Sequence, residues 1–377
     1  MNIAISTRFL IANKLEGIGR YALETTRRIV AAHPEHTFYF FFDRPFSADF
    51  LFAPNVVPVV LQPPARHPFL YVLWYEWAVA RALRQYECSV FYSPDGFLSL
   101  RSSVPTVMTI HDIVYQHRPE DLGFLLRKYY AYYVPRFLRR ADHLFTVSDY
   151  TRKDILQSVS GLTANKISVT YNACNDSSFH ALSANEKTAV RAEYTDGKPY
   201  FFYVGSIHPR KNLIGLLQGF EQFKNENTTA DTLLLIAGRM AWKTSDIKTY
   251  YEQMQHRNAV VFLDYVSAEA LVRLVGAAHA LCYVSLYEGF GIPILEGMYA
   301  EVPVLTSNVT SMPEVAGDAA LLVNPSDSAR IADGLTQLYS DAELCAELVA
   351  RGRERREAFS WEVSAAHIWE RMMTIVK

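Results

Sequence analysis

The sequence predicts an α/β fold with two Rossmann-like, doubly wound domains that face each other across a cleft. The chain has 377 residues, more than one hydrophobic core usually supports. Short β-branched or apolar runs alternate with longer helical patterns, which is typical of a parallel sheet with crossover helices. The same alternation begins again after the polar, turn-rich passage at 177–199, which indicates a second domain.

The expected strands follow from these apolar runs. In the first domain they lie at 2–7, 37–42, 89–94, 106–112, 143–148 and 167–172. In the second domain they lie at 200–206, 232–238, 259–266, 280–285, 302–307 and 319–323. We place the domain boundary near 180, which gives an N-terminal domain at 1–180 and a C-terminal domain at 181–358. The segment 359–377 has apolar residues at helical spacing, so we expect a helix that packs back towards the first domain.

Composition excludes several classes of protein. Hydrophobic residues make up 50% of the chain and charged residues 20%, as in ordinary globular proteins. A formal net charge of −2 gives no overall electrostatic reason to expect a nucleic-acid partner. The cysteines are scattered, without a C-x-x-C pair, and are expected to be free thiols in a reducing compartment: Cys88, Cys174, Cys282 and Cys345.

The opening "MNIAIST" lacks the basic and apolar regions of a secretory signal, so we expect a cytoplasmic protein. The apolar, aromatic stretch at 69–83 is interrupted by Glu76 and Arg81 and is too short to cross a bilayer. Any membrane association is therefore expected to be peripheral. The segment at 121–143 combines several arginines with many tyrosines. Its basic face could touch anionic lipid headgroups, or it could be the solvated face of a packed helix.

Two candidate sites lie in the first domain. Gly17 and Gly19 follow the first strand and open a helix, as in phosphate-binding turns, although they could serve only the turn itself. His111, followed by Asp112, stands at the end of an apolar strand. Strand carboxyl ends border the ligand crevice in open α/β sheets, so this His could reach a substrate or could be structural.

The second domain opens with a strand, a glycine and two adjacent cations. Gly205 follows the strand, and Arg210 and Lys211 lie in the turn before a helix. A guanidinium binds a phosphate through two hydrogen bonds and an ammonium acts as a point charge, so the pair suits a diphosphate. The alternative is a solvated surface pair.

The stretch "SLYEGFGIPILEGM" at 285–298 places two carboxylates around a glycine turn. Glu288 precedes Gly289 and Gly291, whereas Glu296 falls in the helix that begins at Pro293. A carboxylate binds the paired hydroxyls of a sugar ring by charge-assisted hydrogen bonds. A purely structural role would require nearby cations or raised pKa values, because buried carboxylates without partners are costly.

With these motifs the chain resembles the retaining glycosyltransferases of family 4 (GT4), which have the GT-B fold. The resemblance also includes "GIGRYALE", "TVSDYTRKDI", "VGSIHPRKN", "PVLTSNVTSMPEVAGDAALLVNPSD" and "FSWE", in the family's order. Several positions differ from the usual pattern: Ala173 and Val284 replace a Gly and a Pro, and Asp264 and Glu301 each replace a Gly.

The resemblance implies a role for each candidate residue. Glu296 would hold the ribose hydroxyls of the nucleotide, Glu288 would contact the hydroxyls of the donor sugar, and Arg210 and Lys211 would bind the diphosphate. The backbone amides of Phe290, Gly291 and Ile292 would approach the donor. Gly19 would sit near the diphosphate from the other domain, and His111 would lie beside the transferred sugar. No D-x-D sequence occurs, so we expect no cofactor and no metal.

The function that follows is hexose transfer from a nucleotide diphosphate sugar to a glycan or a lipid-linked sugar in cell-surface polysaccharide synthesis, with GDP-mannose as the expected donor. The N-terminal domain would bind the acceptor and the C-terminal domain the donor. The alternatives are a transferase for UDP-glucose or UDP-N-acetylglucosamine, a GT-B-fold sugar-nucleotide epimerase, and a noncatalytic nucleotide-sugar-binding subunit.

Overall fold

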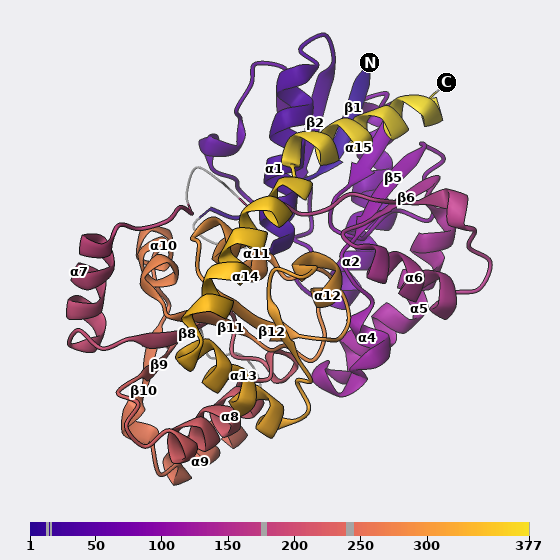
Figure 1. The fold of residues 1–377 in the computed structure, drawn as a ribbon. Helices are drawn as coiled ribbons and strands as arrows, with labels where there is room; N and C mark the ends of the chain where they lie inside the picture. Colours follow the sequence, from indigo (N-terminus) through magenta and orange to yellow (C-terminus); the bar gives the residue numbers. More distant parts are fainter. Residues whose placement is uncertain (13–14, 16, 175–178, 239–244, 377) are drawn as a thin grey trace. The chain divides into compact units, whose positions relative to one another are not determined.

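A computed structural model of the protein describes residues 1–12, 15, 17–174, 179–238 and 245–376 (Figure 1). The chain divides into two compact units. Unit 1 comprises Met1–Asn172 together with Ser360–Lys377, and unit 2 comprises Ala173–Phe359. The first division therefore falls ahead of the position near 180 expected from the sequence, and the second falls next to the start expected for the last segment.

Unit 1 is built on a parallel sheet with the strand order β3-β2-β1-β4-β5-β6-β7. Its strands are β1 (Asn2–Ser6), β2 (Thr37–Phe42), β3 (Val56–Val60), β4 (Val90–Ser93), β5 (Thr106–Ile110), β6 (His143–Thr146) and β7 (Ile167–Val169). Its helices are α1 (Gly17–Ala32), α2 (Pro68–Leu73), α3 (Ala80–Gln85), α4 (Val114–His117), α5 (Phe124–Arg140), α6 (Asp149–Ser158) and α15 (Trp361–Val376), and a π-helical turn at Trp74–Val79 joins α2 to α3.

The sequence did not predict β3. Its run "VVPVV" contains Pro58, which argues against a central strand because proline cannot donate a ladder hydrogen bond. Among the strands that the structure describes, β3 pairs only with β2 and stands at the end of the strand order, where a proline is tolerated. The other strands of unit 1 lie where the apolar runs predicted them.

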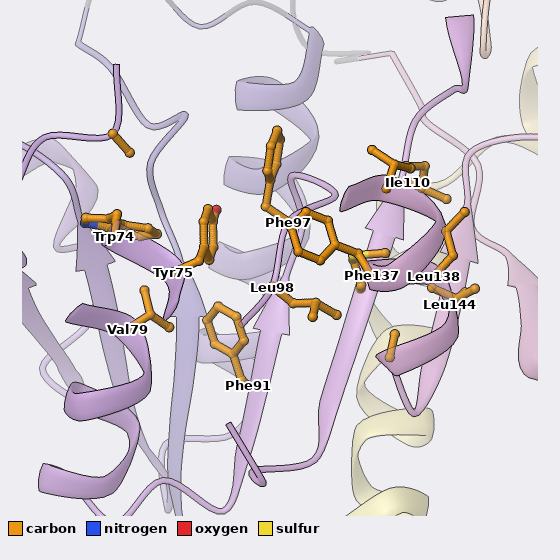
Figure 2. Close-up of a cluster of buried hydrophobic side chains, with 14 of the residues drawn as sticks. Trp74, Tyr75, Val79, Phe91, Phe97, Leu98, Ile110, Phe137, Leu138 and Leu144 are labelled. Atoms are coloured by element: carbon orange, nitrogen blue, oxygen red, sulfur yellow. The ribbon is translucent and has the colours of Figure 1, made fainter. Parts of the chain in front are cut away.

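The core of unit 1 gathers aromatic and branched side chains from the sheet and from helices on one face (Figure 2). Trp74, Tyr75 and Phe91 are at most 1% exposed. Because parallel strands are covered on both faces, they appear as continuous apolar runs rather than as alternating ones. This is why β1, with its buried run Ile3–Ser6, could be recognised from the sequence.

The last helix, α15, belongs to unit 1 and packs beside α1 (Figure 1). The ring of Trp361 lies 5.8 Å from that of Tyr21, and the ring of Trp369 stacks on His33 at 3.6 Å. Ser364 Oγ donates a 2.8 Å hydrogen bond to the carbonyl of Tyr171. The chain therefore returns from unit 2 to the unit in which it began.

Unit 2 repeats the architecture with the order β10-β9-β8-β11-β12-β13, again with parallel pairing. Its strands are β8 (Tyr200–Val204), β9 (Leu233–Ala237), β10 (Val260–Asp264), β11 (Ala280–Tyr283), β12 (Val304–Ser307) and β13 (Leu321–Val323). Its helices are α7 (Ala184–Thr195), α8 (Leu213–Glu226), α9 (Ser245–Gln253), α10 (Ala268–Ala277), α11 (Ile292–Tyr299), α12 (Met312–Ala316), α13 (Ser328–Ser340) and α14 (Ala342–Arg355). Every strand predicted for this unit is present.

Several non-glycine residues of unit 2 adopt backbone conformations that favour glycine, among them Asp264 and Glu301. Asp264, at the end of β10, has φ of +53°, and Glu301 has φ of +54°. Left-handed backbone is unfavourable for residues with a Cβ atom. Both residues stand where the resemblance described above expects glycine. The backbone therefore keeps the left-handed conformation that glycine favours, although each residue carries a side chain.

Candidate active site

The candidate site of unit 2 lies at the point where the strand order reverses. β8 and β11 are neighbours, and the chain proceeds from them toward opposite edges of the sheet. In open α/β sheets a crevice forms outside the carboxyl ends of two such strands. Gly205 follows β8 and Glu288 lies in the loop after β11, so the predicted site residues border this crevice.

The loop after β8 presents two cations in a short 3₁₀ turn, Pro209–Lys211. His208 caps this turn by accepting a hydrogen bond from the backbone of Arg210 at 3.3 Å. Asn212 follows with φ of +58°, and its side-chain amide donates to the carbonyls of Val284 and Pro325 at 3.0 and 2.7 Å. Asn212 thereby ties the cation-bearing loop to the segment after β11.

Arg210, Lys211 and Glu288 form a bridged ion cluster. Arg210 Nη1 lies 2.8 Å from Glu288 Oε2, and Lys211 Nζ lies 2.6 Å from Glu288 Oε1. The side chains are 26%, 11% and 8% exposed, respectively. The two cations are therefore not a solvated surface pair, and the cations that a buried Glu288 would require are in place.

The electrostatics of the cluster follow from its burial and its charges. Burial opposes the ionised form of Glu288, but Arg210 and Lys211 outweigh it and lower the pKa of this carboxyl from 4.5 to about 2. Lys211 Nζ also donates to the hydroxyl of Tyr283 at 2.8 Å. Burial, reinforced by Glu288, raises the pKa of Tyr283 well above its usual value. At neutral pH the site holds two cations, one carboxylate and a neutral phenol.

The glycine turn leads directly into α11. Gly291 has φ of +107° and caps this helix, and Ile292 is its first residue. Ser311 Oγ donates to the carbonyls of Glu288 and Phe290 at 2.9 Å each, which fixes the turn from the segment after β12. Glu296 lies on α11 and is 8% exposed.

Backbone conformation explains Gly205, which has φ of +149° and donates a 3.0 Å hydrogen bond to the carbonyl of Ala237. A Cβ atom at Gly238 would lie 1.8 Å from the carbonyl oxygen of Gly205, so the loops after β8 and β9 touch through their backbones.

Two predicted residues lie in unit 1. His111 follows β5, and its Nε2 lies 2.8 Å from the carbonyl oxygen of Pro94. Gly19 lies in the first turn of α1, which begins at Gly17, so these glycines open the helix as the sequence predicted. A Cβ atom at Gly19 would lie 2.6 Å from the carbonyl oxygen of Phe9. This glycine therefore lets α1 approach the loop after β1, which is a packing role sufficient to explain it.

Sequence reasoning missed the side chains that shape the cluster. Tyr283 ends a buried strand and carries no local signal of a polar role. Asn212 and Ser311 stand inside motifs that were recognised, but the hydrogen bonds of Asn212 span 72 and 113 residues of sequence and those of Ser311 span 21 and 23.

Within the described ranges, no three His, Cys, Asp or Glu side chains gather as a metal site would require. Cys88, Cys282 and Cys345 form no disulfide bond. Among the helices described, none combines the length and apolarity needed to span a bilayer.

Comparison with known proteins assigns the family. The model named Glycosyltransferase Family 4 matches residues 15–178, and that named Glycosyl transferases group 1 matches residues 185–355. The chain is 33% identical over 359 residues to the O-antigen chain mannosyltransferase B of Escherichia coli, covering 92% of this chain and 93% of that protein. The chain belongs to the family 4 glycosyltransferases. This glycosyltransferase is also 29% identical over 280 residues to the O-antigen chain mannosyltransferase RfbU of Salmonella typhimurium, covering 73% of this chain and 72% of RfbU.

Solved structures agree on the fold. The glycosyltransferase aligns with WaaG, a glycosyltransferase involved in lipopolysaccharide biosynthesis, with a TM-score of 0.77 at 16% identity over 98% of this chain and 99% of WaaG. It aligns with Alr3699/HepE of Anabaena in complex with UDP and glucose with a TM-score of 0.75 at 17% identity, over 98% and 99% of the two chains. The fold is GT-B, as predicted.

Proposed function

We propose that this glycosyltransferase is a cytoplasmic, metal-independent enzyme that transfers mannose from GDP-mannose to a hydroxyl of a glycan or lipid-linked sugar, with retention of anomeric configuration, in lipopolysaccharide synthesis. The observation that carries the proposal is the cluster of Arg210, Lys211 and Glu288 at the switch point of unit 2. The donor sugar and the pathway are inferred from the similarity to the two O-antigen chain mannosyltransferases.

The cluster suits a donor diphosphate because it is charged before the donor arrives. One carboxylate faces two cations, which leaves about one net positive charge in a mostly buried site. Arg210 and Lys211 then stabilise the negative charge that develops on the leaving diphosphate, with little reorganisation at the moment of transfer. Glu288, held by these cations, keeps lone pairs for hydroxyl groups of the sugar.

The remaining residues take the roles that the family resemblance implies. Glu296 on α11 accepts hydrogen bonds from the ribose hydroxyls, and the amides of Phe290, Gly291 and Ile292 approach the donor at the positive end of α11. Gly205 leaves the end of β8 open to the donor. His111 and Gly19 contribute from unit 1, which binds the acceptor.

We also propose that α5 of unit 1 touches the cytoplasmic membrane surface, where a lipid-linked acceptor resides. Phe124, Leu125 and Tyr132 are 64%, 60% and 53% exposed on this helix. Arg127 and Lys128 lie beside Phe124, whereas Arg139 and Arg140 are occupied by contacts within the protein. Apolar side chains flanked by cations suit an anionic bilayer surface.

Transfer is tested with purified protein, a lipid-linked glycan acceptor and GDP-mannose, UDP-glucose or UDP-N-acetylglucosamine, with and without EDTA. We expect transfer from GDP-mannose that EDTA does not abolish, and an α-linked product by NMR. Lys211→Ala should lower kcat/KM by about 100-fold or more, because a charge acting on the leaving group is lost. Lys198→Ala is the matched control, since Lys198 pairs with Asp231 at the surface at 2.9 Å.

Other outcomes identify the alternatives. Transfer from a UDP-sugar alone would replace the donor, and conversion of a sugar nucleotide without acceptor would indicate an epimerase. Donor binding without turnover would indicate a noncatalytic subunit. For the membrane contact, Leu125→Ser should reduce sedimentation with anionic vesicles, whereas Val363→Ser, at a residue 69% exposed on α15, should not. Equal sedimentation of both variants would contradict the contact.

A further inference from the structure

A buried carboxylate stands at the switch point of unit 1, outside the roles assigned above. β1 and β4 are neighbours from which the chain proceeds toward opposite edges, and Asp95 lies just after β4. The side chain of Asp95 is 1% exposed. It accepts hydrogen bonds from Ser6 Oγ at 3.1 Å, Arg8 Nε at 3.2 Å, Tyr75 OH at 3.0 Å and Ser93 Oγ at 2.8 Å.

The partners of Asp95 are themselves held in place. The guanidinium carbon of Arg8 lies 4.3 Å from the centre of the Phe97 ring and 4.7 Å from that of Phe9. The Tyr75 ring stacks on Phe97 at 5.7 Å, and both belong to the core drawn in Figure 2. A cation clamped between rings and paired with a carboxylate leaves Asp95 little freedom to move.

Asp95 also organises the turn at 93–97. Ser93 Oγ shares its one hydrogen between Asp95 Oδ1 and the carbonyl of Phe97, so the turn is closed on itself. Pro94 lies between these anchored residues, and its carbonyl oxygen is the partner of His111 Nε2. The position of that carbonyl is therefore set by the contacts of Asp95.

This contact determines which ring nitrogen of His111 carries the hydrogen. A carbonyl oxygen only accepts, so Nε2 must be the donor. Burial lowers the pKa of His111 below its usual value, although Pro94, Asp112 and Asp95 oppose the change. The ring is thus neutral at neutral pH, and Nδ1 keeps a lone pair. In the described part of the chain, no other residue makes a hydrogen bond to the His111 ring that would occupy this lone pair.

We propose that Asp95 is a positioning residue for His111. Through the turn at 93–97 it fixes the Pro94 carbonyl, which holds His111 as the Nε2-protonated tautomer and reserves Nδ1 as an acceptor for a substrate hydroxyl. The substrate part of this inference rests on the proposed function, whereas the tautomer does not.

The tautomer is measured on the ligand-free protein with ¹⁵N-labelled histidine, by long-range ¹H–¹⁵N correlation. His111→Asn identifies the signals of His111 by their loss. We expect one protonated nitrogen, Nε2, and one unprotonated nitrogen, Nδ1, at pH 7.5. A His111 ring protonated on Nδ1, or on both nitrogens, would overturn the proposal.

Two variants test the role of Asp95. Asp95→Asn should mix the two His111 tautomers, and Ser93→Ala should shift the signals the same way by less. Asp43→Asn is the control, because Asp43 is also a buried carboxylate, 2.6 Å from Arg44 Nε. It accepts a hydrogen bond from the backbone of Ala65 and has no contact with the Asp95 network among the described residues. Unchanged His111 signals in a folded Asp95→Asn protein would refute the positioning role, and Ser93→Ala decides alone if that variant does not fold.

Kinetics then connect the network to transfer. Asp95→Asn should lower kcat on the order of 10- to 100-fold with little change in the donor KM, because a misplaced group costs rate rather than donor binding. Mixed His111 tautomers together with an unchanged kcat in Asp95→Asn would refute the role of Nδ1 as an acceptor for a substrate hydroxyl. Absence of transfer in the unmodified protein would instead refute the proposed function and leave the tautomer result standing.

Discussion

Replacing Glu288 with glutamine should destabilise the protein strongly at neutral pH. The side chain keeps its size but loses the charge that faces Arg210 and Lys211 at 2.8 and 2.6 Å. Two cations then remain in a mostly buried site without a carboxylate, and removing one partner of a buried ion pair is costly.

The magnitude follows from the pKa of Glu288. Its fall from 4.5 to about 2 corresponds to about 3 kcal/mol of stabilisation at pH 7, at about 1.4 kcal/mol for each tenfold change. A carboxyl whose pKa is lowered on folding stabilises the protein above its unfolded pKa, and this contribution is lost as pH falls through the folded pKa. By the same relation, only about 1.4 kcal/mol remains at pH 3.

Thermal unfolding of the unmodified protein and of Glu288→Gln at pH 7 and pH 3 measures this difference. If unit 2 unfolds in its own transition, about 3 kcal/mol corresponds to a Tm decrease of roughly 6–12 °C at pH 7. The gap should shrink by about half at pH 3. Glu193→Gln is the control, since Glu193 pairs with Arg273 at 2.6 Å on the surface, where ion pairs contribute little. Equal Tm values at pH 7, or a gap independent of pH, would refute the assignment of Glu288 as the ionised centre of the cluster.

Three further predictions concern the scaffold. Gly19→Ala should destabilise the protein by about 1–3 kcal/mol, because the added Cβ atom would lie 2.6 Å from the carbonyl oxygen of Phe9. Gly17→Ala is the control and should leave the stability unchanged, because no atom lies within 4 Å of its added Cβ. Equal Tm values for the two variants would contradict this prediction. Asp264→Gly should stabilise by up to about 1 kcal/mol by relieving φ of +53°, and a lower denaturation midpoint would argue against strain there. Burial, followed by the positive charge of Arg371, lowers the pKa of His143 from 6.5 to about 4. Between these two pH values the unfolded chain therefore binds a proton that the folded chain does not, so Tm should rise with pH from 4 to 6.5. His143→Gln should flatten that rise, and an unchanged slope would show that other groups cause it.

The alternation of strands and helices was readable because buried parallel strands form continuous apolar runs. The failure at β3 has a specific cause, since Pro58 is incompatible with a central strand and acceptable only at an edge. Whether a run is central or peripheral depends on the strand order, which no local pattern contains.

The candidate site was predictable as separate residues but not as a cluster. Arg210, Lys211 and Glu288 each stood out at the end of a strand. Their ion pairs span 77 and 78 residues, so only the folded sheet shows that the carboxylate pairs with both cations. Asn212 and Tyr283 could not be assigned because their partners lie in the segments that follow other strands. In contrast, the sequence alone showed that Asp264 and Glu301 replace the glycine of the family pattern. Their positive φ values explain why glycine is usual at these positions.

The return of α15 to the starting unit makes unit 2 an insertion within unit 1. Two chain crossings, at 172–173 and at 359–360, connect the units, and both termini belong to unit 1. A gene encoding 173–359 would express unit 2 as one uninterrupted polypeptide, whereas unit 1 requires a splice that joins 172 to 360. A tag or surface anchor at either terminus would hold unit 1, and tension applied between the two ends would act on unit 1 first.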